Sequence, residues 1–266
     1  MKINEIIADL KATGSWVKWN RATRDRVLFG DIDQTVTGIG VCWVASEKAI
    51  QQAIKQNVNL IISHENAFYK AGTCLETQFV NQIEKKQKLL SEYVICIYRC
   101  HDVWDAMPEY GVSDQWAKRL GYPLLQKRVI DSYYQWVKIE TSSVKDVAQH
   151  IANVVKKDGE EGLYVFGDVD KKINTLALGT GAATNLFEMI SGYDKVDALV
   201  VSDDGITNYC EVQFALDSGV PLIVVNHAGC EMCGIEGMKR YFKQKYPDLL
   251  VQRLNEGYDI HYYLGK

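Results

Sequence analysis

The sequence predicts an α/β protein built on largely parallel strands. Short apolar stretches typical of buried strands alternate along the chain with amphipathic stretches typical of helices, and 47% of the 266 residues are apolar. Alternating β and α segments are the pattern of layered folds in which helices cover a sheet. A chain of this length buries a substantial core and fits one large domain or two smaller ones.

The first half of the chain carries three predicted strands with helices between them. Ile3, Ile6, Ile7 and Leu10 recur at helical spacing, and acids lie among them, which predicts a helix of the mature fold rather than a secretory signal. The elements that follow are strands near 38–44, 58–63 and 93–98, and helices near 47–56, 75–90 and 114–120.

A second series of strands opens after residues 121–123. Its strands are predicted near 135–139, 163–166, 175–179, 198–202 and 222–225, and a helix at 144–155 follows a serine cap. The alternation of Tyr258, Ile260, Tyr262 and Leu264 with more polar residues predicts a final half-buried strand, which leaves His261 on its polar face.

The two series resemble each other. Residues 53–62 and 215–224 share a helix end, a turn and an apolar strand, and each strand runs within a few residues into a histidine. We therefore predict two similar α/β halves with mixed, largely parallel sheets, one at 1–122 and one at 123–266. Each half would present strand ends to a shared metal-binding cleft.

Charge and cysteine content narrow the classes of function. The net charge is −4, and the basic residues are interspersed with acids, so nucleic acid and anionic membranes are not expected as partners. No apolar run is long enough to span a bilayer. Seven scattered cysteines in a chain that needs no disulfide staples favour a reducing, cytoplasmic location.

Three polar clusters stand where predicted strands end, at residues 63–66, 100–105 and 226–231. Ligands bind beyond the carboxyl ends of strands in parallel α/β folds. The clusters hold three of the five histidines, each within four residues of a carboxylate, and imidazole with carboxylate suits zinc, manganese or iron. Three readings stay open: one zinc on three histidines, two ions bridged by two histidines and three carboxylates, or hydrogen-bonded loop pairs without metal.

In their order along the chain, the clusters resemble the Nif-three-like dinuclear metal-binding family, whose members are often named GTP cyclohydrolase 1 type 2. That family has a His-His pair after a buried strand, then a His-x-x-x-Asp, and near the C-terminus a His-x-x-x-Glu. The resemblance implies His64, Asp105, His227 and Glu231 as metal ligands, with Glu231 as a bridge. It also implies two divalent transition-metal ions (Zn, Mn or Fe), a supporting or catalytic role for His101, and assembly into a homohexameric ring.

Departures from the family pattern indicate a divergent member. Glu65 replaces the second histidine of the first pair; as a harder ligand it would shift the preference away from zinc. The family's Asp-x-Thr after the first strand is absent, since residues 43–46 stand there. Its Gly-Asp…His segment corresponds to residues 200–209, which hold Asp203 and Asp204 but no histidine.

Two other motifs offer rival chemistry. Cys230 and Cys233 form a Cys-x-x-Cys, which is a redox motif in some proteins and helix-start packing in others. Residues 179–184 follow a strand and open a helix like a nucleotide-binding turn, but the third glycine is missing, so a tight βα turn is the simpler interpretation.

The predicted function is a metal-dependent hydrolase that attacks a small heterocyclic or phosphorylated substrate with metal-activated water. The predicted metal ligands are His64, Glu65, Asp105, His227 and Glu231. His101, Trp104 and Asn66 would line the substrate side. The alternative is a non-catalytic hexameric metal-binding module that acts in metal handling or through protein partners.

Overall fold

The computed structural model describes residues 1–69, 77–124, 134–183, 185–206 and 209–263. The chain divides into two compact units. Unit 1 comprises Met1–Tyr110 and Ile235–Tyr258, and unit 2 comprises Gly111–Gly234 and Asp259–Lys266. The predicted halves meet between 122 and 123, whereas in the structure each unit is made of two segments, and helix α9 (His227–Lys245) begins in unit 2 while its later residues belong to unit 1.

Unit 1 is built on a five-stranded mixed sheet in the order β1-β4-β3-β2-β10. Strands β2 (Ile39–Cys42), β3 (Leu60–Ser63), β4 (Cys96–Arg99) and β10 (Val251–Arg253) run parallel, and β1 (Arg26–Phe29) joins β4 antiparallel. Every residue of β2, β3 and β4 is buried, which explains their continuous apolar runs. The first residues of β1 therefore lie at the same sheet edge as the carboxyl ends of the parallel strands.

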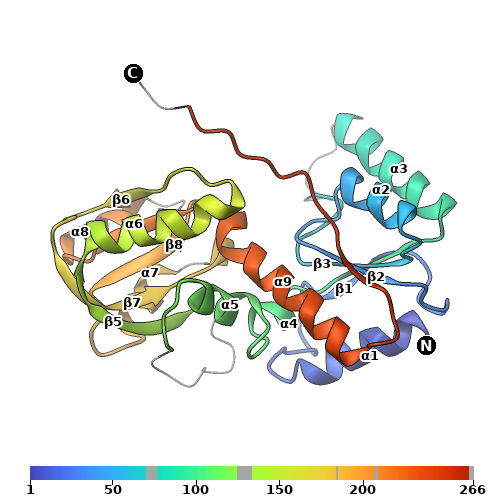
Figure 1. Ribbon diagram of the computed structural model, residues 1–266, viewed down its shortest axis with the longest axis horizontal. Helices are drawn as coiled ribbons and strands as arrows, with labels where there is room; N and C mark the ends of the chain where they lie inside the picture. Colours follow the sequence, from blue (N-terminus) through green and yellow to red (C-terminus); the bar gives the residue numbers. More distant parts are fainter. Residues whose placement is uncertain (70–76, 125–133, 184, 207–208, 264–266) are drawn as a thin grey trace. The chain divides into compact units, whose positions relative to one another are not determined.

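Helices cover both faces of the unit 1 sheet (Figure 1). Helices α2 (Glu47–Lys55) and α3 (Thr77–Glu92) pack on the face that carries Ile61 and Ile97. Helix α1 (Ile3–Thr13) lies on the opposite face, where its apolar side is buried. Ser46 accepts a hydrogen bond from Ala49 N, which starts α2 immediately after the loop that follows β2.

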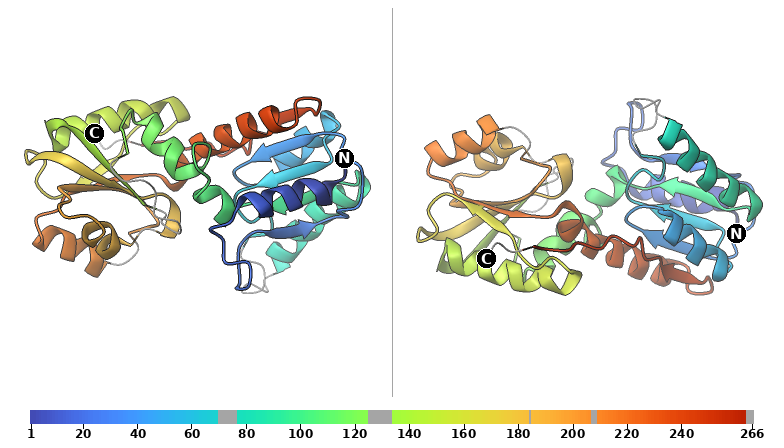
Figure 2. Two further views of the ribbon diagram at one scale, coloured as in Figure 1. Left: turned by 90° about the horizontal axis from the view of Figure 1, so that it is seen from below. Right: turned by 90° about the horizontal axis from the view of Figure 1, so that it is seen from above.

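Unit 2 is built on a second five-stranded mixed sheet in the order β5-β7-β8-β9-β6. Strands β7 (Lys172–Leu178), β8 (Ala198–Ser202) and β9 (Leu222–Val225) are parallel. The antiparallel strands β5 (Gln135–Ser143) and β6 (Tyr164–Phe166) form the two edges. Figure 2 shows this sheet between its helices from two further sides.

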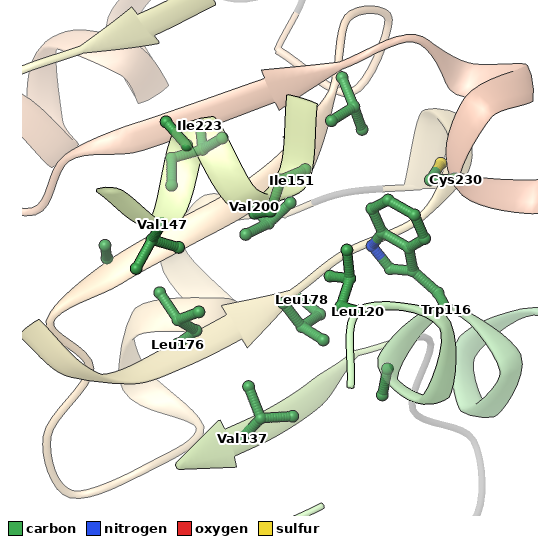
Figure 3. Close-up of a cluster of buried hydrophobic side chains, with 14 of the residues drawn as sticks. Trp116, Leu120, Val137, Val147, Ile151, Leu176, Leu178, Val200, Ile223 and Cys230 are labelled. Carbon is green, nitrogen blue, oxygen red and sulfur yellow. The ribbon is translucent and has the colours of Figure 1, made fainter. Parts of the chain in front are cut away.

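Two apolar layers hold unit 2 together. Helix α6 (Val144–Val155), started by the Ser143 cap, packs on one face with α5 (Val112–Arg119), as Figure 3 shows for Val147, Ile151 and Trp116. Helices α7 (Leu186–Ser191) and α8 (Tyr209–Asp217) bury the other face. Short connections η1 (Lys156–Asp158) and η2 (Gly181–Ala183) and, in unit 1, the four-residue helix α4 (Asp102–Asp105) complete the described elements.

The predicted fold class is confirmed: the chain is an α/β protein with two mixed sheets. The predicted final strand at 258–264 is wrong. The last strand of the described residues is β10, and residues 258–263 form no strand, while Leu264 lies outside the described residues. Alternating apolar and polar residues form a strand only where a partner supplies backbone hydrogen bonds, and no strand among the described residues pairs with 258–263. Among the described helices, none has the length and apolar character needed to cross a bilayer.

Candidate metal centre

The first two polar clusters meet at the carboxyl edge of the unit 1 sheet. Strand β3 ends at Ser63, and the backbone N–H groups of His64 and Glu65 still donate to Cys42 O and Trp43 O of the neighbouring segment. On the next strand along, β4 ends at Arg99, and His101 lies directly before α4, whose last residue is Asp105. Adjacent parallel strands thus bring residues from both clusters to one place.

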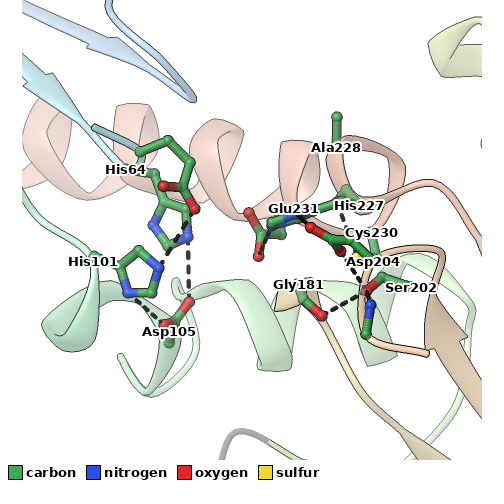
Figure 4. A network of polar contacts seen from close by, with 12 residues as sticks. His64, His101, Asp105, Gly181, Ser202, Asp204, His227, Ala228, Cys230 and Glu231 are labelled. Carbon is green, nitrogen blue, oxygen red and sulfur yellow. Dashed lines mark hydrogen bonds and ion pairs between the residues drawn. The ribbon is translucent and has the colours of Figure 1, made fainter. Parts of the chain in front are cut away.

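His64, His101 and Asp105 form a compact, buried group. Their ligand atoms all lie within 4.8 Å of one another, which is close enough to hold one metal ion. His64 Nε2 lies 3.3 Å from Asp105 Oδ1, and His101 Nδ1 lies 3.0 Å from Asp105 Oδ2. The two imidazole rings are stacked, with centroids 4.5 Å apart and planes inclined by 8° (Figure 4). His101, which the resemblance places behind the ligands, lies inside this group.

Glu65 lies beside the group and is held by an arginine. Its Oε2 accepts from an Arg99 guanidinium nitrogen at 2.7 Å, and its Oε1 lies 3.5 Å from His101 Nε2. Arg99 Nε also donates to His64 O at 3.0 Å, so one guanidinium supports two successive residues of the first cluster. Sequence reasoning missed Arg99, because nothing in the local pattern shows which acid a strand-end arginine meets.

A second residue missed by sequence reasoning, Asp25, holds the start of α4. Its carboxylate is buried and accepts from the backbone N–H groups of His101 at 2.9 Å, Asp102 at 2.7 Å and Val103 at 3.3 Å. Helix α4 has no side-chain cap of its own, so Asp25, from the segment before β1, satisfies its first donors. This cap fixes the turn that carries His101 and Asp105.

The carboxylates around His101 set its protonation. Burial alone would lower the pKa of His101, but Asp105, Asp102 and Glu65 outweigh it and hold that pKa well above its ordinary value. The pKa of Asp102 is depressed despite burial, because His101, Thr23 and the backbone of Arg24 donate to it. The group is therefore arranged to favour positive charge at the His101 imidazole.

The third cluster forms a polar group in unit 2. His227 is the first residue of α9, and Glu231 lies one turn later on the same face, with His227 Nε2 3.0 Å from Glu231 Oε1 (Figure 4). Both side chains are largely buried. An imidazole and a carboxylate at this spacing can hold one cation between them.

Asp203 and Asp204 position His227. Asp203 accepts from His227 N at 3.0 Å, and Asp204 Oδ2 lies 2.8 Å from His227 Nδ1. Nδ1 thus faces a carboxylate and leaves Nε2 toward Glu231, the orientation in which a histidine serves as a metal ligand. Burial lowers the pKa of His227, but Asp204 and Glu231 raise it to about 11. Both aspartates are expected from the sequence only as part of a family segment, although they directly follow strand β8, as the other polar clusters follow their strands.

The Gly-x-Gly turn packs directly against this pair. Gly181 has φ +63°, and a Cβ there would lie 2.4 Å from Glu231 Oε1 and 3.1 Å from His227 Nε2. Ser202 Oγ donates to Gly181 O at 2.5 Å and fixes the turn. The glycine thus serves the approach of the backbone to the polar pair, which is a different use from a nucleotide-binding turn.

The other residues that the sequence suggested for chemistry have structural roles in this fold. Cys230 and Cys233 are buried in the unit 2 core, and burial raises the pKa of Cys233 to about 12, so neither supplies a ready thiolate. Trp104 is fully buried against Tyr241 and Phe242, so its predicted place on the substrate side is wrong. Asn66 stabilises its own turn by accepting from Phe68 N.

A buried glutamate, Glu160, also supports the start of α9. Its Oε1 accepts from Asn226 N at 2.7 Å, and only 2% of the residue is exposed. Burial raises the pKa of Glu160 to about 7, with Asp203 and Asp158 adding to the rise and the Asn226 hydrogen bond opposing it. This carboxyl therefore titrates near neutral pH.

Gly181→Ala should destabilise unit 2, because the new methyl group must displace Glu231. Gly219→Ala is a matched control: its φ of +68° imposes the same backbone strain, but no heavy atom lies within 4 Å of the added Cβ. We expect Gly181→Ala to lower the free energy of unfolding by roughly 1–3 kcal/mol more than the control, measured by urea denaturation. Equal losses for the two variants would show that the close approach to Glu231 has no energetic consequence.

Glu160→Gln should change the pH dependence of stability. The pKa of Glu160 in the folded chain lies above the ordinary value of 4.5. The contribution of Glu160 to the free energy of unfolding is therefore fully present below about pH 4.5 and is lost as the pH rises through about 7. The variant should therefore unfold with a free energy roughly 1–3 kcal/mol higher than the parent at pH 8 and close to it at pH 5. The exposed neighbour Glu161→Gln serves as control, and a parent-to-variant difference that is independent of pH would contradict the assignment.

Comparison with known proteins agrees with this geometry. The family model described as Duf34/NIF3 (NGG1p interacting factor 3) matches residues 1–255. A Pasteurella multocida (strain Pm70) protein described as a GTP cyclohydrolase 1 type 2 homolog is 26% identical over 227 residues, 84% of each chain. Staphylococcus aureus protein SA1388 has a similar structure, with a TM-score of 0.80 at 17% identity over 99% of each chain. A Bacillus cereus protein related to NIF3 gives 0.78 at 13% identity, again over 99% of each chain.

At these identities the two solved structures support the fold alone. The family model covers nearly the whole chain, and it confirms the family that the three strand-end clusters predict. The chain belongs to the Duf34/NIF3 family, at modest identity to its relatives.

Proposed function

We propose that this chain is a metal-dependent hydrolase of a small heterocyclic or phosphorylated substrate. The observation that carries the proposal is the group of His64, His101 and Asp105, whose ligand atoms lie within 4.8 Å of one another. Imidazole and carboxylate together suit zinc, manganese or iron. His227 and Glu231 in unit 2 supply a second set of the same chemistry.

We assign the residues two roles, metal ligand and proton carrier, according to their side-chain chemistry. His64, Glu65, Asp105, His227 and Glu231 hold two divalent ions, as the family resemblance implies. When bound, such ions lower the pKa of a coordinated water and polarise the bond that it attacks. His101 is oriented by Asp102, whose Oδ1 lies 3.0 Å from Nδ1, so it can hold or move a proton at Nε2.

One observation favours a second candidate, a non-catalytic metal-binding module. His64 is fully buried and Asp105 is 5% exposed, which resembles a closed structural site more than an open catalytic one. Assembly into a homo-oligomer, a hexameric ring by resemblance, belongs to both candidates and would be read from the mass in solution by light scattering.

The purified chain should carry close to two transition-metal ions. Elemental analysis of protein never exposed to chelator or to a nickel column measures this. Asp105→Asn and Glu231→Gln should each lower the metal content, because each keeps the side-chain shape and loses the charge that attracts a cation. Chelation should lower the melting temperature of the parent, since ions that bind only the folded chain stabilise it by mass action.

Hydrolysis separates the enzyme from the module. The metal-loaded parent should cleave a member of a panel of phosphate esters and cyclic amides, and Asp105→Asn should lose this activity. A chain that is metal-free and does not take up added manganese, iron or zinc would rule out both candidates. A fully metal-loaded chain without hydrolytic activity would contradict the enzyme and favour the non-catalytic metal-binding module.

Glu65 determines which metal the chain prefers. Glu65→Gln should weaken metal binding, because it removes a carboxylate next to His101, and Glu65→His should shift the preference toward zinc, because imidazole is the softer ligand. Competition titrations with zinc and manganese measure both effects. Glu47→Gln, in helix α2, removes a carboxylate that pairs with Lys85 instead. If Glu65→Gln binds metals as this control does, Glu65 is not a ligand.

A further inference from the structure

Lys86 is a buried lysine that takes no part in the proposed hydrolysis. Only 2% of this residue is exposed, whereas Lys88, two residues later in helix α3, is open to solvent. The Nζ of Lys86 donates to Ala45 O at 3.2 Å and to Ala67 O at 2.7 Å. No carboxylate among the described residues forms an ion pair with Lys86. A buried ammonium group is costly unless its donors are satisfied, so its hydrogen bonds to these carbonyls matter for the fold.

The two carbonyls belong to the segments that follow β2 and β3. Backbone hydrogen bonds join these segments beyond the strand ends, from His64 N to Cys42 O at 3.1 Å and from Glu65 N to Trp43 O at 2.6 Å. Two residues further along each segment, the ammonium group of Lys86 bridges the two carbonyls. The lysine therefore continues the connection between the two segments beyond the last of these backbone hydrogen bonds.

Lys86 also contacts the turn that follows Glu65. The ring of Tyr69 lies over Lys86 Nζ, with 4.6 Å between Nζ and the ring centroid, which is a cation–π contact. Tyr69 has φ +61°, a backbone conformation that residues with a side chain rarely adopt and that the surrounding structure must hold. Asn66 Nδ2 donates to Tyr69 O and closes the turn. Lys86 thus holds this turn at two points, the carbonyl of Ala67 and the ring of Tyr69.

We propose that Lys86 is a positioning residue, whose ammonium group holds the segments after β2 and β3 together and thereby fixes His64 and Glu65 in place to bind metal. The inference rests on the proposed function, in which both residues are metal ligands. Arg99 holds the start of the second segment, through His64 O and the Glu65 carboxylate, and Lys86 holds its later part. Metal ligands depend on such support, because binding requires their atoms to keep a defined geometry.

The first test is hydrogen exchange of backbone amides in the full chain, stripped of metal by a chelator. Lys86→Met keeps the apolar stem and removes the donors. We expect the amides of His64 and Glu65 to exchange about tenfold faster than in the parent, as the loss of a hydrogen bond from a charged group implies, while exchange in strand β4 stays unchanged. Lys88→Met is the matched control, because it makes the same change at an exposed position of the same helix.

A second variant, Tyr69→Leu, tests the proposal even where Lys86→Met does not fold. Tyr69 is 38% exposed, and leucine meets the same backbone strain at this position. The change removes the ring above the ammonium group and leaves both hydrogen bonds of Lys86 in place. We expect a smaller acceleration of exchange at His64 and Glu65, in the same direction as in Lys86→Met.

Manganese titration of the folded variants connects this positioning to metal binding. We expect Lys86→Met to bind manganese about tenfold more weakly than the parent, as the loss of support behind a metal ligand implies. Lys88→Met should bind manganese as the parent does. Unchanged affinity in a variant with faster exchange at His64 and Glu65 would overturn the role of Lys86 in positioning the ligands.

The exchange rates decide the proposal independently of metal. Equal rates at His64 and Glu65 in the parent, Lys86→Met and Tyr69→Leu would overturn it. Faster exchange spread evenly over β3 and β4 would overturn it too, since Lys86 would then only stabilise the unit as a whole. A parent that binds no metal would overturn the proposed function, while the rates in the metal-free chain would still show whether Lys86 fixes these two residues.

Discussion

Charged side chains buried at the ends of parallel strands must be paired, and this requirement organises both units. In unit 1, Arg99 forms an ion pair with Glu65, and the buried carboxylate of Asp25 accepts hydrogen bonds from three backbone N–H groups at the start of α4. In unit 2, Asp203 and Asp204 perform both tasks for His227, one at its backbone and one at its ring. An unpaired charge on the buried Asp25 would cost several kcal/mol, so its backbone partners are a condition for the fold as well as for the site.

Elements specified by local signals were predictable. The helix Val144–Val155 follows a serine cap and has one apolar face, and the strands Ala198–Ser202 and Leu222–Val225 are short apolar runs between turns. The edge strands β1 and β10 escaped prediction because each depends on a distant partner: β1 pairs with β4, and β10 pairs with β2 across most of the chain. Pairing over such sequence separations leaves no local periodicity to read.

The candidate ligands were predictable for the same local reason that their partners were not. His64, His101 and His227 each follow a buried strand, a position visible in the sequence. Arg99 contacts Glu65, 34 positions away, and Asp25 contacts His101, 76 positions away. No rule of sequence spacing predicts either contact. Sequence therefore identifies candidate ligands more readily than the residues that hold those side chains in place.

The electrostatics of the two groups point to the same chemistry. Burial by itself would drive the imidazoles of His101 and His227 toward their neutral forms, yet the pKa of each is raised, because the carboxylates of Asp105, Asp102, Asp204 and Glu231 act in the opposite direction. A surrounding that stabilises an extra proton on a buried imidazole also stabilises a divalent cation beside it, since both are positive charges among the same oxygens. Metal binding would then release the protons, so affinity should rise with pH until the imidazoles no longer compete. The carboxylates that position His101 and His227 thus also make each polar group favourable for a positive charge, whether a proton or a cation.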